Sequence, residues 1–347
     1  MQDWYVLQNP SVRWIVDGLF PADGHSAIVG KPKAGKSTLI RNLVASVIKS
    51  RPFLDRPVNV PQGTGKVLYI HLDRKDRPAR VAAELKELEI TDDEAPRLHF
   101  IVAEDLPADI DSRLQWLKQE IEEFKPNLLV IDLMLQFLDV QNSNDYKQVL
   151  KAINDLQDAL SQAHFEGALV AAFHSRKAVN PDCPADDVLG STAIRGSFGT
   201  LILLSQNRKE KLHSIMSDQT DREHPWGEID PTEIVRNPDG TMELGRSLYD
   251  LEKAEKAKKT EDDLRRLLTF LNEHPDSSTE ELIEALTISK PRLLALIQRG
   301  SDLIASTGEG KKGSPKLYSL KAGAELSACG IGAMNEETEK FLNAFGS

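Results

Sequence analysis

The sequence predicts an α/β fold with a mainly parallel sheet, followed by a smaller, mostly helical domain. Between residue 25 and about residue 205, apolar runs alternate with amphipathic helical patterns, which is the order of successive βαβ units. Residues 251–263 are almost entirely charged or small, and a second set of helical patterns follows them. We therefore expect four parts, a large domain, a charged linker, a small domain and a loosely ordered tail, over residues 1–250, 251–263, 264–320 and 321–347.

The apolar runs and helical patterns also predict the individual elements of the large domain. Strands are expected at 25–30, 66–72, 98–102, 127–132, 167–173 and 199–204, and helices at 36–50, 78–89, 111–124 and 145–165. Three further β-like runs, near 211–216, 232–236 and 241–244, are expected to extend the sheet with antiparallel strands.

The composition is that of a globular protein. The chain has 347 residues, of which 40% are hydrophobic and 28% charged, enough for a sizeable core. No apolar run approaches the ~18 residues that span a membrane, and the first residues lack the pattern of a secretory signal. Cys183 and Cys329 have no metal-ligand spacing, so we expect a reduced, cytoplasmic protein without a membrane partner. A net charge of −11 argues against indiscriminate binding of nucleic acid, but not against a local basic surface.

Residues 30–38 match the phosphate-binding pattern G-x-x-x-x-G-K-[ST] at every fixed position. They read Gly30, Lys31, Pro32, Lys33, Ala34, Gly35, Lys36, Ser37 and Thr38. In such a loop the glycines let the backbone turn around a polyphosphate, Lys36 reaches the β- and γ-phosphates, and the Ser37 hydroxyl ligates Mg²⁺. A strand before the loop and a helix after it speak against a Gly-rich turn that matches by chance. We expect these nine residues to bind ATP.

A second nucleotide signal is Asp132, which follows the apolar residues Leu128, Leu129, Val130 and Ile131. A strand that ends in a carboxylate places the acid at the sheet edge beside the phosphate loop, where it can hold Mg²⁺ through water. Asp132 is therefore the second candidate for metal binding, with Ser37.

Two more strand ends carry polar residues with a candidate catalytic role. Asp73 follows strand 66–72, where a carboxylate can polarise the attacking water; the alternative is that it caps helix 78–89 or lies in a polar turn. His174 follows strand 167–173, where it can sense the γ-phosphate; the alternative is a structural histidine. Arg176 and Lys177, in the loop that follows, are candidate DNA contacts.

Taken in order, these motifs resemble the RepA-like branch of the RecA superfamily, which comprises ATPases of plasmids, phages and integrated elements, including ring-forming replicative helicases. The similarity covers roughly residues 10–245, and the segments that carry it are Trp14-Ile15-Val16-Asp17-Gly18-Leu19, the phosphate loop, Val67-Leu68-Tyr69-Ile70-His71-Leu72-Asp73, Val130-Ile131-Asp132, His174-Ser175-Arg176-Lys177 and Gly190-Ser191-Thr192-Ala193.

The resemblance implies a RecA-like core that binds ATP between neighbouring subunits of a homo-oligomer. It implies that Lys36 and Ser37 contact the phosphates and Mg²⁺, that Asp132 holds Mg²⁺ through water, and that His174 senses the γ-phosphate.

Two positions depart from the family's pattern. The family usually has Glu where this chain has Asp73, so the carboxylate lies about 1.5 Å further back. The arginine finger, which a neighbouring subunit supplies, falls on Gly199. Arg195 and Arg222 are the nearest substitutes, and nothing in the sequence chooses between them. Both departures concern hydrolysis and not nucleotide binding.

The small domain resembles a winged helix-turn-helix, because three helical patterns precede a hairpin. Leu264, Leu267, Leu268 and Leu271 form the first apolar stripe, and Ser278 begins the second helix. The third helix begins after Ser289, and its core residues are expected to be Leu293, Leu294, Leu296 and Ile297. Two strands are expected at 303–306 and 316–320.

Basic residues of this domain predict DNA as its partner. Between residues 284 and 321, seven basic residues outnumber three acidic ones, which gives a net charge of +4. The candidate DNA contacts, expected to point outward, are Lys290, Arg292, Arg299, Lys311, Lys312 and Lys316. The alternative is a domain that uses the same surface for protein contacts or subunit packing.

The sequence thus predicts an ATP-binding and ATP-hydrolysing DNA-binding protein that acts in the replication or maintenance of a mobile element, with a hexameric helicase as one form of it. A second hypothesis is an ATP-gated DNA-binding or assembly switch with little turnover and no unwinding. A metabolic kinase ranks third, because no substrate-binding pattern is visible.

Overall fold

The computed structural model describes residues 13–73, 77–175, 192–207, 212–219, 229–311 and 314–322. It divides the chain into two compact units, Met1–Leu248 and Tyr249–Ser347. Among the residues expected to bind DNA or to act as the finger, Arg176, Lys177, Arg222 and Lys312 lie outside the described residues, as do residues 323–347 of the expected tail.

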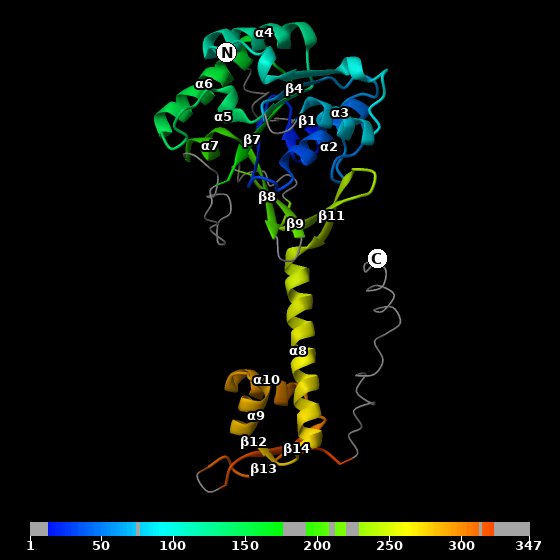
Figure 1. Cartoon of the computed structure of the whole chain (residues 1–347), viewed down its shortest axis with the longest axis vertical. Helices are drawn as coiled ribbons and strands as arrows, with labels where there is room; N and C mark the ends of the chain where they lie inside the picture. Colours follow the sequence, from blue (N-terminus) through cyan, green and yellow to red (C-terminus); the bar gives the residue numbers. More distant parts are fainter. Residues whose placement is uncertain are drawn as a thin grey trace, which may run out of the picture. The chain divides into compact units, whose positions relative to one another are not determined.

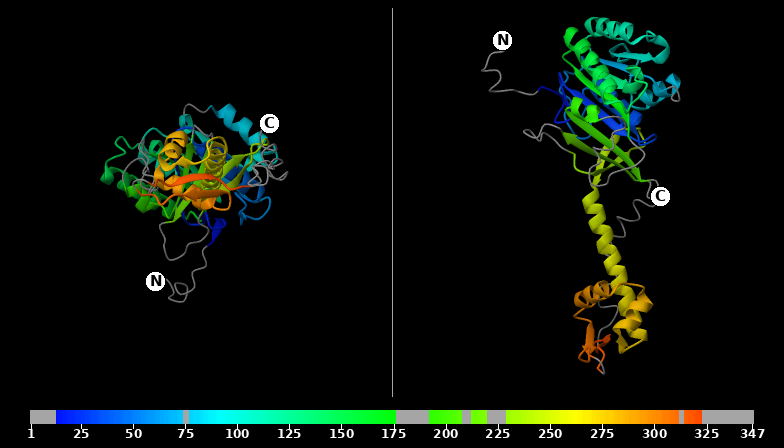
Figure 2. Two further views of the ribbon diagram at one scale, coloured as in Figure 1. Left: turned by 90° about the horizontal axis from the view of Figure 1, so that it is seen from below. Right: turned by 90° about the vertical axis from the view of Figure 1, so that its left-hand side faces the viewer.

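The first unit is built on one large sheet (Figures 1 and 2). In the described residues its strand order is β11-β10-β9-β8-β3-β7-β6-β4-β5. The strands that pair in parallel are β3 (His25–Gly30), β4 (Val67–His71), β5 (Leu98–Val102), β6 (Leu128–Asp132), β7 (Ala168–His174) and β8 (Thr200–Asn207). Strands β9 (Leu212–Gln219), β10 (Thr232–Arg236) and β11 (Met242–Ser247) continue it with antiparallel pairing. The predicted mainly parallel sheet is confirmed, including its antiparallel extension.

Helices cover both faces of this sheet, because its strands are apolar on both sides. The helices are α2 (Lys36–Lys49), α3 (Pro78–Glu87), α4 (Ile110–Phe124), α5 (Met134–Phe137), α6 (Tyr146–Gln162) and α7 (Thr192–Ser197). Residues of α2 and α3 pack into one apolar core, and residues of α4 to α7 pack into another (Figure 1). Alternation along β3 supplies both cores, with Ile28 in the first and Ala27 and Val29 in the second.

Several short elements were not predicted, because they are too short to show a periodic pattern of apolar residues. They are the hairpin β1 (Trp14–Val16) and β2 (Phe20–Pro21), helices α5 and α7, and two 3₁₀ turns at Ala95–Arg97 and Ala103–Asp105. The longer helices begin where side chains cap them. Asp109 accepts a hydrogen bond from the Ser112 N–H at the start of α4, and Asp145 does the same for two N–H groups of α6.

The segment expected as a charged linker, 251–263, is helical and belongs to α8 (Leu248–Glu273). Its Glu, Lys and Ala residues are strong helix formers, and pairs such as Lys256–Glu252, at 3.4 Å, lie one turn apart. The residues 252–259 are exposed, so the segment carries no apolar stripe that would predict a helix.

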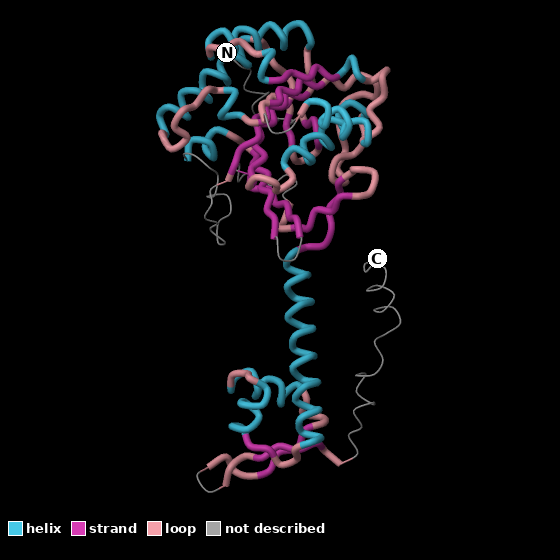
Figure 3. The backbone as a smooth tube through the Cα atoms, in the orientation of Figure 1, coloured by secondary structure: helices cyan, strands magenta, loops and turns pink. Residues whose placement is uncertain are grey.

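The second unit contains the expected three helices and hairpin. Its elements are α8, β12 (Ser277–Ser278), α9 (Thr279–Leu286), α10 (Lys290–Arg299), β13 (Ile304–Thr307) and β14 (Leu317–Leu320), and its strands form an antiparallel sheet in the order β12-β14-β13 (Figure 3). Leu267, Leu268 and Leu271 of α8 pack with Leu293 and other residues into one core. The prediction that Leu294 faces this core is wrong, because its side chain is 46% exposed. Leu293 and Leu296 occupy the buried side of α10, which leaves Leu294 on the opposite side.

The outward orientation predicted for Arg292 is also wrong. Its side chain is half-buried, and its guanidinium donates to Asp263 Oδ2 at 3.1 Å and to Thr260 Oγ1 at 3.0 Å. Asp263 lies on α8 and is buried, and Arg266 pairs with its second oxygen at 3.9 Å. Arg292 thus links α10 to α8 through these hydrogen bonds. Lys290, Arg299, Lys311 and Lys316 are exposed, as expected.

We expect Asp263→Ala to destabilise the second unit by about 2 kcal/mol, because the charged hydrogen bonds of Arg292 are lost. Hydrogen exchange of the full-length chain measures this as weaker protection of the α10 amides. Asp302→Ala, which removes an exposed carboxylate from the same unit, is the control. Equal protection of α10 in both variants would show that the Arg292 contacts contribute nothing to stability.

Candidate functional site

The phosphate loop connects the end of β3 to the start of α2, as its spacing predicts. Gly35 has φ of 101°, a left-handed conformation that favours glycine, and it precedes the first residue of α2. At Gly30 a Cβ atom would lie 2.8 Å from the Leu204 carbonyl oxygen, so only glycine fits beside β8. The loop therefore places the N-terminus of α2, with its unpaired N–H groups, at the carboxyl edge of the sheet, where anions bind.

Strand register brings the other predicted site residues to the same edge. Gly30 on β3 is directly paired with His174 on β7, and Asp132 on β6 is paired with His71 on β4. The site residues that the sequence takes from four strand ends therefore lie together, as parallel pairing requires.

Lys36 is buried in the site, and polar atoms surround its ammonium. Its side chain is 6% exposed, and its ammonium donates to the carbonyl oxygens of Gly30 at 2.8 Å and Lys31 at 3.3 Å. The Nδ1 atom of His174 lies 3.3 Å from the same ammonium. Burial lowers the pKa of Lys36, and the nearby charges of Asp132 and Asp73 oppose this shift. Burial, and then the charge of Lys36, lower the pKa of His174, so the imidazole is neutral at pH 7 and can accept from Lys36.

The candidate metal ligands Ser37 and Asp132 are in direct contact. The Ser37 hydroxyl donates to Asp132 Oδ2 at 3.0 Å, and the Tyr69 hydroxyl lies 3.5 Å from the same oxygen. Asp132 is 1% exposed, and burial raises its pKa, while His71, Ser37, Lys36 and Arg41 act against this rise. A hydroxyl and a carboxylate oxygen side by side are ligands of the kind that Mg²⁺ prefers, so the residues present fit this ion.

Asp73 lies just beyond the end of β4 and is half-buried. It lines a cavity of about 180 Å³ together with His71, Arg77 and Glu104. The alternative that it caps helix α3 is wrong, because the N-cap of α3 is Arg77 and no side chain caps it. Its charge acts on Lys36 and on His174, so it is close enough to the phosphate loop to influence both groups.

For the expected arginine finger, the structure describes Arg195 and Gly199. Arg195 lies on α7 and is half-exposed, and Gly199 is exposed at the start of β8. A Cβ atom at Gly199 would meet only the His25 carbonyl oxygen, at 4.0 Å. Among the described residues, the backbone therefore leaves room for a side chain at the position where the RepA-like resemblance predicts an arginine.

Two polar residues of the site were not singled out for a role by the sequence. Tyr69 and His71 lie on β4 within an apolar run, and both are buried beside Asp132, with the Tyr69 hydroxyl 3.4 Å from His71 Nδ1. The signal that would have found them is their spacing of two on a strand, which places both side chains on the face that carries Asp132.

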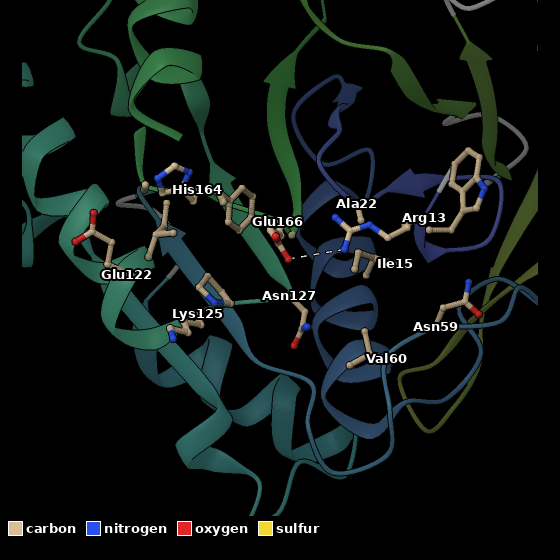
Figure 4. Close-up of a pocket in the computed structure, with 16 residues that line it drawn as sticks. Arg13, Ile15, Ala22, Asn59, Val60, Glu122, Lys125, Asn127, His164 and Glu166 are labelled. Atoms are coloured by element: carbon tan, nitrogen blue, oxygen red, sulfur yellow. Dashed lines mark ion pairs between the residues drawn. The ribbon is translucent and has the colours of Figure 1, made fainter. Parts of the chain in front are cut away.

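A larger cavity lies at the other edge of the sheet (Figure 4). It has a volume of about 590 Å³, and its lining includes Arg13, Trp14, Asn127 and Glu166. Asn127 immediately precedes β6 and Gly167 precedes β7, so the cavity lies at the amino ends of the strands. Ligands of parallel sheets bind at the carboxyl ends, and the nucleotide site is therefore the one at the phosphate loop.

In the described residues, no group of three or more His, Cys, Asp or Glu side chains could hold a metal ion. None of the described helices combines the length and the apolar character that crossing a membrane requires.

A mainly parallel sheet whose central strand β3 leads into a phosphate loop, with the buried carboxylate of Asp132 at the end of β6 in contact with Ser37 of that loop, defines a P-loop ATPase with a RecA-like core. A family model described as an AAA domain (AAA_25) matches residues 2–180, more than half of the chain, and the chain belongs to this family. A search of curated proteins found no match.

Among solved structures, a KaiC-like protein from the hyperthermophilic archaeon Pyrococcus horikoshii OT3 is similar at 10% identity. The TM-score is 0.48, and the match covers 67% of this chain and 99% of that chain.

The lowered pKa of His174 predicts how the protein responds to acid. The unfolded chain takes up this proton at the ordinary pKa of 6.5, whereas the folded chain takes it up only at a lower pH. The stability contributed by neutral His174 is therefore present above pH 6.5 and is lost as the pH falls through the folded pKa.

We expect the free energy of unfolding to fall more steeply between about pH 7 and pH 5 for the wild type than for His174→Gln. Urea denaturation at several pH values measures the difference. His25, whose pKa burial also lowers, is present in both proteins, so its effect cancels. Parallel curves for the two proteins would contradict the prediction.

Proposed function

We propose that this chain is an ATP-hydrolysing, DNA-binding protein of the RepA-like branch, which acts in the replication or maintenance of a mobile element. The observation that carries the ATPase part is the contact between Ser37 and Asp132, 3.0 Å apart, beside the buried ammonium of Lys36. A loop that matched the phosphate-binding pattern by chance would not bring these three groups together.

In this proposal each group has a separate task in hydrolysis. Lys36 holds the β- and γ-phosphates, and His174 senses the γ-phosphate through its contact with Lys36. Ser37 and Asp132 would hold Mg²⁺, which supplies positive charge to the phosphate oxygens when bound. Asp73 takes a proton from the water whose oxygen bonds to the γ-phosphorus, while the bond to the β-phosphate oxygen breaks.

Assembly is part of the same proposal. The RepA-like resemblance favours a homo-oligomer with ATP between subunits, in which Arg195 or Arg222 of a neighbouring copy contacts the phosphates. A ring-forming helicase is one form that such an assembly takes.

The second unit is proposed as a winged helix-turn-helix that contacts DNA. Its element order and its excess of basic residues between 284 and 321 support this. Since Arg292 is engaged with Asp263, the contacts proposed for the described residues are Lys290, Arg299, Lys311 and Lys316, all exposed. Lys312 is proposed with them, and Arg176 and Lys177 as contacts of the first unit.

A second candidate function is an ATP-gated switch, in which nucleotide controls assembly or DNA binding with little turnover. The short carboxylate at Asp73 and the absence of a side chain at Gly199 favour it. Gel filtration with ATP and Mg²⁺, paired with a turnover assay, distinguishes the two functions, because a switch assembles without appreciable hydrolysis.

We expect Lys36→Ala to abolish nucleotide binding, because its ammonium is the buried positive charge that faces the phosphates. We expect the wild-type ATPase rate to rise when single-stranded DNA is added. Steady-state hydrolysis with and without DNA, with subunit number determined in parallel, measures both effects. An unchanged rate with every nucleic acid tested would exclude a DNA motor.

Substitutions of Asp73 test whether this residue is the general base of ATP hydrolysis, and the test needs no DNA. We expect Asp73→Asn to lower kcat about a hundredfold with little change in the KM for ATP, because the base acts on water and not on bound nucleotide. Asp73→Glu should retain or raise kcat, since it restores the longer carboxylate. The exposed Asp92→Asn is the control. Equal rates for Asp73→Asn and the wild type would support the switch.

A further inference from the structure

Strand order divides the surroundings of the phosphate loop into two sides. Strand β3 lies between β7 and β8. On the β7 side are His174, which contacts the Lys36 ammonium, and then Asp132 of β6. Since the lysine of a phosphate loop reaches the β- and γ-phosphates, this side receives the γ-phosphate. The nucleoside must then leave the loop on the opposite side, toward β8 and the antiparallel strands.

The antiparallel strands bring further strand ends and the β10–β11 turn to this side of the loop. Strand β8 runs parallel to β3 and therefore ends at the loop edge, and β9 starts there. Strand β10 is antiparallel to β9, so it also ends at this edge, and β11 starts there at Met242. The β10–β11 turn lies beside α2 (Figure 1).

Hydrogen bonds fix this turn to the phosphate-loop helix. The buried side chain of Asn42, on α2, donates to the carbonyl oxygens of Gly240 and Thr38, each at 3.1 Å. Its own oxygen accepts from the Met242 N–H at 3.0 Å. Asn42 thereby bridges the first turns of α2 to the β10–β11 turn and sets where Met242 lies.

Two side chains from these strands reach the loop itself. The Met242 methyl carbon lies 4.0 Å from the position of a Cβ atom on Gly35, and its side chain is half-buried. The ring of His213, on β9, has its Nδ1 atom 3.5 Å from the Ala34 carbonyl oxygen. A thioether and an imidazole are both suited to pack against a flat aromatic ring.

From these contacts we propose that Met242, assisted by His213, forms the wall against which the base of the bound nucleotide packs, and that Asn42 is the residue that positions this wall. The inference rests on the proposed function, since it assumes that the loop holds a nucleoside triphosphate. It adds that the antiparallel extension of the sheet recognises the nucleoside.

The test compares a ligand that has a nucleoside with one that lacks it. Isothermal titration calorimetry of the full-length chain with Mg²⁺ uses the non-hydrolysable ATP analogue AMP-PNP and inorganic tripolyphosphate. We expect Met242→Ala to weaken AMP-PNP binding about fivefold and to change tripolyphosphate binding less than twofold. Met242→Leu keeps the apolar volume and should bind AMP-PNP within about twofold of the wild type.

The matched control is Met216→Ala. Met216 lies on β9 and packs against the core on the other face of the sheet, away from α2. It should leave both affinities unchanged. Asn42→Ala should reproduce the selective loss of AMP-PNP binding, and its thermal midpoint, measured in parallel, should stay near that of Met242→Ala.

Three results would overturn the inference. One is an equal loss of affinity for AMP-PNP and tripolyphosphate in Met242→Ala. Another is an unchanged affinity of Met242→Ala for both ligands. The third is a wild type that binds tripolyphosphate as tightly as AMP-PNP. That result would contradict recognition of the nucleoside but not the proposed ATPase function. A wild type that binds neither ligand would instead contradict the proposed function itself.

Discussion

The buried ammonium of Lys36 is the constraint on which the site depends. A charge that is almost removed from water must be met by polar groups, and here the carbonyl oxygens of Gly30 and Lys31 accept its hydrogen bonds. His174 lies within 3.3 Å, and the carboxylates of Asp132 and Asp73 favour the charged form. These groups come from the ends of four strands, so the ammonium is satisfied only while the strands keep their register. The sheet, rather than any single loop, therefore assembles the site.

The parallel and antiparallel halves of the sheet contribute different features to the surroundings of the phosphate loop. Parallel pairing brings strand ends with polar side chains together on the β7 side, where we propose that the γ-phosphate binds. Antiparallel pairing on the β8 side brings the start of β9 and the β10–β11 turn to the same edge, and Asn42 holds this turn against α2 through hydrogen bonds. The antiparallel extension therefore adds the β10–β11 turn to the surroundings of the phosphate loop, the side on which we propose that the nucleoside binds.

Sequence reasoning predicted the parts of this arrangement that depend on local pattern. The phosphate loop follows from its spacing, and Asp132 and His174 follow from the apolar strands that they end, since parallel strands align their carboxyl ends. The roles of Asn42 and Arg292 depend on contacts between residues far apart in the chain, such as Asn42 with Gly240 and Arg292 with Asp263. No periodicity encodes such contacts. Helix α8 was missed for a different reason, because an exposed helix stabilised by charged pairs has no apolar stripe.

The position of Asp73 decides between an enzyme and a switch. A hydrogen bond to the attacking water requires about 2.6–3.2 Å, so a carboxylate set back by about 1.5 Å loses direct contact unless its strand end lies further forward. Asp73 lies between β4 and α3, and α3 is tied to the phosphate-loop helix by the ion pair of Arg41 with Glu84. Arg41 is buried on α2, so any shift of α2 on binding phosphate acts on α3 through a charged contact with little freedom. Hydrolysis with the shorter side chain requires that the end of β4 holds Asp73 nearer to the loop, and the ion pair of Arg41 with Glu84 is a contact that connects the phosphate-loop helix α2 with α3, the helix that follows Asp73 in the chain.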